Sequence, residues 1–119
     1  MIEIKLPWPD AKLNPNNRTH QIKKNVVAQE AKDYAYYMTL SYRFGQWNEN
    51  ETITATYTFY PPDDYRKRDT DNFLSSCKPY QDGICAALDI DDSSIRRTVI
   101  EWGEVIDGGL VKVTLEPME

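Results

Sequence analysis

The sequence predicts a single α+β domain over residues 1–119, with two helices packed on a small mixed sheet of about four strands. Three observations support this prediction. The 119 residues suffice for one hydrophobic core but not for two domains that each fold alone. Hydrophobic residues make up 40% of the chain and charged residues 28%, as in soluble globular proteins. Segments with the two-residue period of strands alternate with segments of helical period.

The amino-terminal strand is expected at residues 1–6, where Ile2, Ile4 and Leu6 alternate with polar residues. The segment Pro7-Trp8-Pro9 ends this strand. The polar, turn-rich residues that follow, together with the basic run 18–24, predict a loop.

A helix is expected next, from about Val26 to Arg43, with Asn25 as its N-cap and Gly45 closing it. Its expected apolar stripe consists of Val27, Ala31, Tyr34, Met38 and Tyr42. Residues 52–60 then alternate hydrophobic residues with threonines and are the clearest strand of the sequence.

Pro61-Pro62 ends that strand, and a charged loop over residues 63–72 leads toward a second helix that reaches about Leu88. Proline is tolerated in the first turn of a helix but not in its interior. Pro79 therefore predicts that regular helix begins only near Ser75 or Ser76. The expected apolar stripe of this helix is Cys77, Tyr80 or Gln81, Ile84, and Ala87 or Leu88.

Two further strands are expected, at residues 95–102 and 110–116. The sequence Asp107-Gly108-Gly109 between them is typical of a tight turn, so these strands are expected to form a hairpin. The predicted order of elements is strand, helix, strand, helix, hairpin.

Composition restricts the possible chemistry. The chain has two cysteines, which lack metal-ligand spacing, and one histidine, His20, without a nucleophile signature beside it. Any catalysis is therefore expected to depend on carboxylates. No segment approaches the roughly 20 apolar residues of a membrane helix, so no membrane partner is expected. The net charge of −5 conceals a basic segment, 12–43, and an acidic one, 101–119.

Two acidic clusters are the candidate catalytic residues. Asp69 and Asp71 are separated by one residue and, in an extended segment, would project to the same side. The pair Asp91-Asp92 follows the second predicted helix and could return beside them. Clustered carboxylates suit Mg²⁺, which assists phosphodiester hydrolysis. The alternative is that these aspartates only cap helices and form turns.

Cations flank both clusters. Arg66, Lys67 and Arg68 directly precede the first, while Lys78 and Arg96-Arg97 lie on either side of the second. Cations next to metal-binding carboxylates can hold the phosphate that is attacked.

The order of these parts resembles the RusA family of Holliday-junction resolvases. The likeness covers nearly the whole chain and includes IKLPWP, RTH, KRDTDN and LDIDDSSI. It implies that Asp69, Asp71 and Asp92 bind the catalytic metal, with Asp91 as an additional ligand. The family lysine is expected one helical turn after the second aspartate, where this chain has Ser75; we assign its role to Lys78.

The resemblance implies a cytoplasmic, bacterial or phage-encoded homodimer that cuts four-way DNA junctions with Mg²⁺, or with Mn²⁺ in its place. The residues expected to contact DNA are Arg18, Lys23, Lys24, Arg66, Lys67, Arg68, Arg96 and Arg97. Two alternatives stay open. One is a module that binds branched DNA with weak or no cleavage, and the other is a metal-dependent phosphohydrolase acting on nucleotides.

Overall fold

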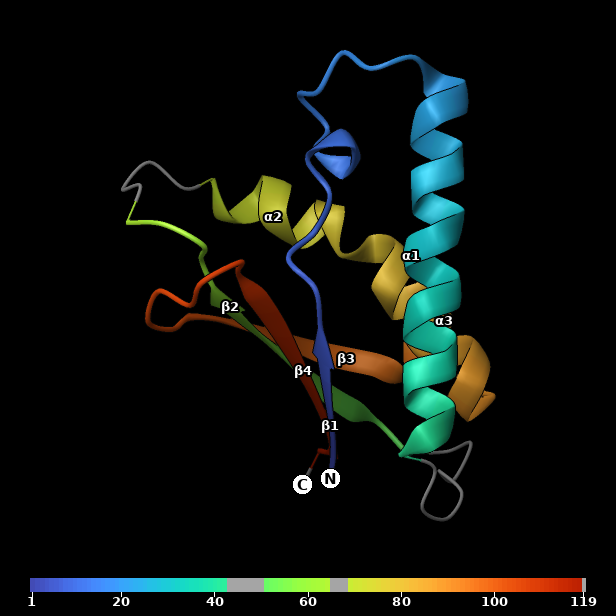
Figure 1. Cartoon of the computed structure of the whole chain (residues 1–119). Helices are drawn as coiled ribbons and strands as arrows, with labels where there is room; N and C mark the ends of the chain where they lie inside the picture. The colour runs from blue at the N-terminus through green and yellow to red at the C-terminus, as the bar shows by residue number, and fades with distance from the viewer. Residues whose placement is uncertain (43–50, 65–68, 119) are drawn as a thin grey trace.

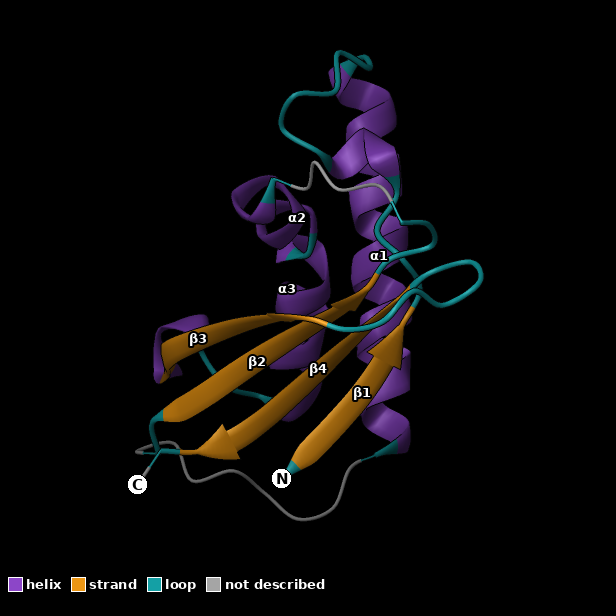
Figure 2. Ribbon diagram, turned by 90° about the vertical axis from the view of Figure 1, so that its left-hand side faces the viewer, coloured by secondary structure: helices purple, strands orange, loops and turns teal. Residues whose placement is uncertain are grey.

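The computed structural model of the chain describes residues 1–42, 51–64 and 69–118. In these ranges a four-stranded sheet is covered on one side by helices (Figures 1 and 2). The strands are β1 (Ile2–Leu6), β2 (Ile53–Tyr60), β3 (Ile95–Trp102) and β4 (Leu110–Pro117). The α-helices are α1 (Gln21–Ser41), α2 (Thr70–Ser76) and α3 (Lys78–Leu88), and η1 (Ala11–Leu13) and η2 (Asp92–Ser94) are short 3₁₀ helices. The predicted α+β domain is confirmed, with three α-helices instead of two.

The sheet has the strand order β1-β4-β2-β3 and is mixed, as predicted. β2 runs parallel to β3, whereas β4 is antiparallel to both β1 and β2. The predicted hairpin is therefore wrong, because β2 lies between β3 and β4 (Figure 2). After β3 the chain keeps pairing with the end of β2: the amide of Gly103 donates to the Phe59 carbonyl at 2.8 Å, and that of Ile106 to the Pro61 carbonyl at 2.9 Å. These hydrogen bonds hold the segment after β3 against the end of β2, so the chain passes β2 before it turns into β4 on the other side.

The core lies between the sheet and the helices. The hydrophobic residues of β2 are buried, as their alternation predicted, since Ile53, Ala55, Tyr57 and Phe59 are each at most 1% exposed. Thr54 and Thr58, on the other face of the strand, are buried as well. The hydrophobic residues of β1 and β4 join them on the same face: Ile2, Ile4, Leu6, Val111, Val113 and Leu115. The helix-covered face of the sheet is thus continuous and apolar.

Helix α1 begins at Gln21, five residues earlier than predicted, and ends at Ser41. His20, not Asn25, is its N-cap and accepts a hydrogen bond from the Ile22 amide. The basic run 18–24 was expected to be a loop. Lys23 and Lys24 lie instead in the first turn of α1. Gly45 lies outside the described residues. None of the described helices is both long and apolar enough to cross a membrane.

The face of α1 that meets the core also differs from the prediction. Ala31 and Met38 of the expected stripe pack against the core, as predicted. Tyr34 and Tyr42 of that stripe are 47% and 39% exposed, whereas Ala35 and Thr39 are buried. The reason is close packing of α1 on α3, where a side chain at Gly83 would overlap the backbone oxygen of Lys32. Small residues are therefore required where the two helices meet.

A break at Cys77 separates α2 from α3. Pro79 lies in the first turn of α3, as predicted, but Cys77 and not a serine precedes the helix. In one continuous helix the Pro79 ring would clash with the carbonyl of Ser75, so the chain ends one helix and starts another. The expected apolar stripe is confirmed by the burial of Cys77, Tyr80, Ile84 and Ala87.

Candidate active site

The first acidic cluster lies where α2 begins. Asp69 is the N-cap of α2: its Oδ1 accepts the Asn72 amide at 3.3 Å, and its Oδ2 accepts the Asn72 side-chain amide at 3.0 Å. Asp71 lies in the first turn and is exposed. The expectation that residues 69–71 are extended is wrong, because Thr70 already belongs to the helix. The capping role anticipated as the alternative is therefore realised at Asp69.

The second cluster repeats this arrangement at η2. Asp91 is the N-cap, and its Oδ1 accepts the Ser93 amide at 2.9 Å. This backbone hydrogen bond is the main cause that lowers the pKa of the Asp91 carboxyl from its ordinary value. Asp92 lies in the first turn of η2 and is exposed. Each cluster thus consists of a capping aspartate and a second aspartate that takes no part in the cap.

Lys78, the first residue of α3, joins α3 to the second cluster. Its Nζ lies 2.8 Å from Asp92 Oδ2 and 3.0 Å from Asp82 Oδ1, one turn further along α3. The hydrogen bond with Asp92, and then the one with Asp82, raise the pKa of Lys78 above its ordinary value. Lys78 is therefore a fixed positive charge near neutral pH and not a proton acceptor. Its side chain is 53% exposed, so solvent and a ligand can reach it.

The described residues do not contain a preformed metal centre. No group of three or more His, Cys, Asp or Glu side chains in these ranges lies close enough together to hold a metal ion. The structure brings Asp92 to Lys78, but it does not gather Asp69, Asp71, Asp91 and Asp92 into one cluster. The donor chemistry still fits Mg²⁺, because exposed carboxylate oxygens are the ligands that this ion prefers.

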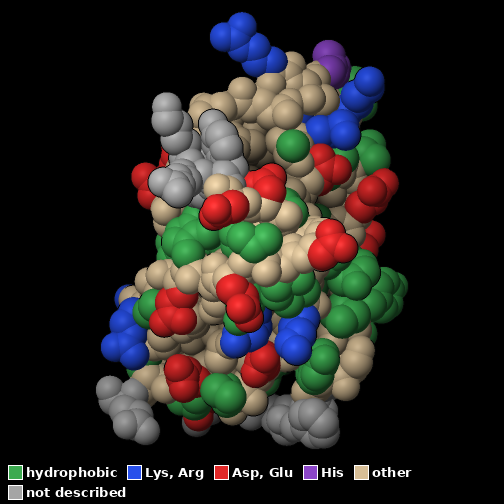
Figure 3. Space-filling view, turned by 60° about the vertical axis from the view of Figure 1, so that its left-hand side comes forward, with side chains coloured by type: hydrophobic (Ala, Val, Ile, Leu, Met, Phe, Trp, Pro, Cys, Tyr) green, Lys and Arg blue, Asp and Glu red, His purple; other side chains and the backbone are tan. Residues whose placement is uncertain are grey.

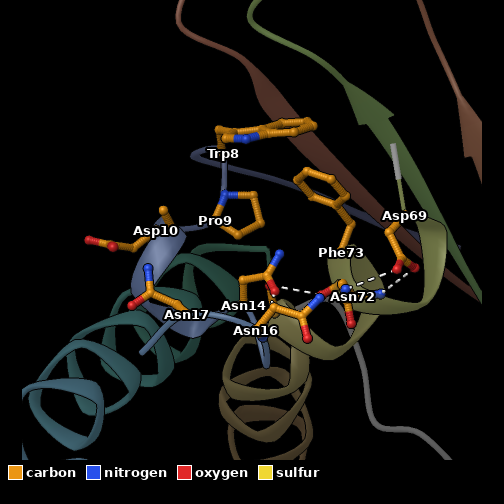
Figure 4. A pocket seen from close by; sticks show the side chains of 11 residues that line it. Trp8, Pro9, Asp10, Asn14, Asn16, Asn17, Asp69, Asn72 and Phe73 are labelled. Atoms are coloured by element: carbon orange, nitrogen blue, oxygen red, sulfur yellow. Dashed lines mark hydrogen bonds between the residues drawn. The ribbon is translucent and has the colours of Figure 1, made fainter. Parts of the chain in front are cut away.

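An open pocket of about 580 Å³ adjoins Asp69 (Figure 4). It lies between the start of α2 and the segment 8–17, which links β1 to α1 and includes η1. Trp8 and Phe73 form one part of its lining, and Asn14, Asn16 and Asn17 lie across from them. From the sequence this segment was expected only to form turns. The signal for a pocket is the occurrence of three asparagines within four residues, close to a tryptophan.

Aromatic rings fix the position of α2 beside this pocket. The ring of Phe73 lies 5.1 Å from that of Trp8 and 5.6 Å from that of Trp102, centre to centre. Phe59 of β2 completes the group, 6.1 Å from Phe73. Gly109 belongs to the same packing, since a β-carbon there would lie only 2.8 Å from the Trp8 side chain. Asp69 is thus attached to a rigid apolar anchor only four residues away.

The comparison with known proteins identifies a relative without a known activity. No family model matches the chain. An uncharacterized protein from Xylella fastidiosa (strain Temecula1 / ATCC 700964) is 33% identical over 120 residues, covering 97% of this chain and 76% of that protein. The chain belongs to the same family as this protein. Because the likeness covers almost the entire chain, the family shares the whole domain and not one motif.

Of the residues of this chain that were predicted to contact DNA, four are exposed, namely Arg18, Lys23, Arg96 and Arg97, and Lys24 is half-buried. Arg97 donates to Thr54 Oγ1 at 3.1 Å. Thr54 alternates with the core residues of β2, so this contact lies on the sheet face opposite the helices. Arg66, Lys67 and Arg68 lie outside the described residues. On the face drawn in Figure 3, acidic side chains extend across the middle, basic ones lie at the top, and both kinds are interspersed in the lower half.

The two thiols are poor candidates for catalysis. Cys77 and Cys85 are free and buried. Burial raises the pKa of the Cys77 thiol to about 12, and burial is also the main cause that raises the pKa of Cys85 to about 11. Both therefore stay protonated at neutral pH, and the exposed carboxylates remain the candidates for chemistry.

Proposed function

We propose that this protein is a metal-dependent DNA endonuclease similar to the RusA family, which resolves four-way junctions by paired symmetric nicks. In this proposal it acts in the bacterial cytoplasm as a homodimer, because a two-fold assembly presents two identical sites to a nearly two-fold substrate. The support comes from the order of the motifs along the chain and from the contacts of the residues that those motifs identify.

The observation that carries the proposal is the 2.8 Å contact between Lys78 and Asp92. The resemblance assigned these residues separately, and Lys78 only by a shift in spacing. The break at Cys77 supplies a physical reason for that shift, because it starts a new helix at Lys78. A lysine and an aspartate that are 14 residues apart in the sequence then meet on an exposed surface. In catalysis Lys78 would stabilise negative charge on the phosphate or the leaving oxygen.

We infer that DNA completes the metal site. Mg²⁺ is usually held by one or two protein carboxylates together with substrate phosphate oxygens and water. Asp69 and Asp71 would supply the first ligands, while Asp92 would join them when phosphate competes for Lys78. Asp91 would act from further away, since its carboxylate caps η2. When bound, the metal would activate water and stabilise the leaving oxyanion. Mn²⁺ is expected to replace Mg²⁺.

A DNA-binding module with weak cleavage is the second candidate. It is favoured by the absence, among the described residues, of three metal-capable side chains close together. In such a module the ion pairs of Lys78 with Asp82 and Asp92 would be purely structural. The exposed cations Arg18 and Lys23 would still bind the DNA backbone.

The deciding experiment is a gel assay of a synthetic four-way junction. Paired nicks that require Mg²⁺ are expected, and they should disappear in excess chelator. Binding without cutting under all metal conditions would support the DNA-binding module. Hydrolysis of a nucleotide panel together with inactivity on junctions would support a nucleotide phosphohydrolase instead.

A further inference from the structure

The pocket beside Asp69 has no role in the cleavage proposal beyond that one carboxylate. Its volume of about 580 Å³ falls within the range of roughly 300–1,000 Å³ that is usual for small-molecule sites. It combines an aromatic wall, Trp8 and Phe73, with several side-chain amides (Figure 4). This combination needs a ligand that has both a flat apolar surface and a polar edge.

The amides are oriented by the loop itself. Asn14 Oδ1 accepts the Asn16 backbone amide at 2.9 Å, and Asn17 Oδ1 accepts the Thr19 amide at 2.8 Å. Both carbonyl oxygens are thus used within the loop. No acceptor among the described residues pairs with the side-chain NH₂ groups of Asn14 and Asn17. The pocket therefore offers hydrogen-bond donors held in place by the turns that they cap.

A nucleobase fits these features. Every base has a π-face that can stack on aromatic side chains, and an edge with acceptor atoms that amide groups can reach. A base can enter such a pocket only when it is unpaired, which costs least where the duplex is already interrupted.

We propose that this pocket binds one unpaired nucleobase of a DNA strand whose backbone passes Asp69. The inference rests on the proposed function for its choice of DNA as the ligand. It adds a recognition step: the base held between Trp8, Phe73 and the asparagines fixes which phosphate lies next to the carboxylate. The protein therefore prefers particular bases at this position, and Asn14, Asn16 and Asn17, which line the pocket, are specificity-determining residues.

The test measures binding and not cleavage. Two fluorescent single-stranded 12-mers are compared by anisotropy in EDTA, one with all its bases and one with abasic residues at every position. The wild type should bind the first roughly ten-fold more tightly, the scale expected for stacking of one base. Asn16→Ala should lower this ratio by roughly three-fold or more, because it removes a hydrogen-bonding group from the pocket.

Two further variants separate recognition from structure. Asn17→Asp keeps the oxygen that accepts from Thr19 but removes the NH₂ donor, so it should also lower the ratio. Asn25→Ala is the matched control: Asn25 is exposed on α1, away from this pocket, and the ratio should stay at the wild-type value.

Equal affinity of the wild type for the two 12-mers would overturn the inference, and so would a full base preference in Asn16→Ala. The proposed function fails differently, through the absence of Mg²⁺-dependent junction cleavage. The two failures are therefore distinguishable, since the binding assay contains no metal.

Discussion

The two acidic clusters are built alike but differ in what holds their second aspartate. Asp69 caps α2 and Asp91 caps η2, each through a backbone amide two or three residues ahead. The next aspartate is Asp71 in one cluster and Asp92 in the other, and both are exposed. Asp92 is paired with Lys78, whereas Asp71 has no hydrogen bond or ion pair with the residues that the structure describes.

In each cluster the two aspartates therefore have separate tasks. The capping aspartate fixes the start of a helix, and the second remains available for a ligand or a neighbouring cation. A capping aspartate that also bound metal would have to share its oxygens between the two tasks. Substitutions that keep the cap but remove the charge can therefore separate stability from activity.

The largest expected effect comes from Asp→Asn changes in the metal-binding set. Asp69→Asn, Asp71→Asn and Asp92→Asn should each reduce junction cleavage at least about 10³-fold, because several kcal/mol of metal-dependent stabilisation is lost. Binding of the junction should survive or become tighter, since each change removes negative charge next to phosphate. Single-turnover cleavage and gel-shift titrations measure the two effects.

Asp91→Asn is the matched control for these three variants. Asparagine is as good an N-cap as aspartate, so Asp69→Asn and Asp91→Asn should both keep the stability of the wild type. Cleavage by Asp91→Asn should be affected least of the four variants. Near wild-type cleavage by any of the other three would remove that residue from the proposed metal site.

The next effect concerns the cation that distinguishes the two clusters. Lys78→Ala should lower the single-turnover rate by roughly 10²-fold, the usual scale for one group that stabilises transition-state charge. Lys23→Ala, an exposed position on α1, should weaken junction binding but leave the rate at saturating protein nearly unchanged. Asp82→Asn removes one partner of Lys78 and keeps Asp92, so it should retain most of the activity.

Identical kinetics for Lys78→Ala and Lys23→Ala would place Lys78 among the ordinary DNA contacts. The catalytic cation would then have to be sought at Arg66, Arg68, Arg96 or Arg97.

Local sequence patterns predicted the helices and strands themselves better than they predicted which strands pair in the sheet. The alternation in β1 correctly identified its buried residues, because a strand with one buried face needs that period. In β2 it identified the buried hydrophobic residues but not Thr54 and Thr58, which are buried on the other face. The predicted hairpin of β3 and β4 was wrong, because its Gly108-Gly109 turn carries no information about β2, which inserts between the two strands. The start of α1 was predicted too late, because His20 is an uncommon N-cap.

For the candidate site too, the sequence identified residues but not their contacts in space. The sequence identified Asp69 and Asp71 but not their conformation, since Asp-x-Asp suits both an extended segment and a helix start. The contact of Lys78 with Asp92 depends on where α3 begins relative to η2, which spacing alone does not determine. The pocket depends on packing between residues far apart in the sequence, such as Trp8 and Phe73.

A smaller effect concerns the two caps. Asp69→Ala should lower the free energy of unfolding by about 1 kcal/mol, the usual cost of losing an N-cap. Asp91→Ala should cost less, because η2 has only three residues whereas α2 has seven. Urea unfolding of both variants and of the corresponding Asp→Asn variants measures the difference. A larger loss in Asp91→Ala than in Asp69→Ala would contradict this assignment of the caps.

The smallest expected effect is in the pH dependence of stability, where Asp91 and Lys78, the partner of Asp92, act at opposite ends of the pH scale. The pKa of Asp91 is lower in the folded protein than its ordinary value of 3.8, mainly because of the Ser93 amide. Its contribution is therefore present above that value and is lost as the pH falls through the folded pKa.

The pKa of Lys78 is raised above its ordinary value of 10.5, first by Asp92 and then by Asp82. Its contribution is present below that value and is lost as the pH rises through the folded pKa. Both groups are exposed, so solvent screening keeps the two changes small. Urea midpoints measured across pH should lose a small acid branch in Asp91→Ala and a small alkaline branch in Lys78→Met. If Lys78→Met retained the full alkaline loss, the ion pair with Asp92 would not be its source, and another group would have to titrate there.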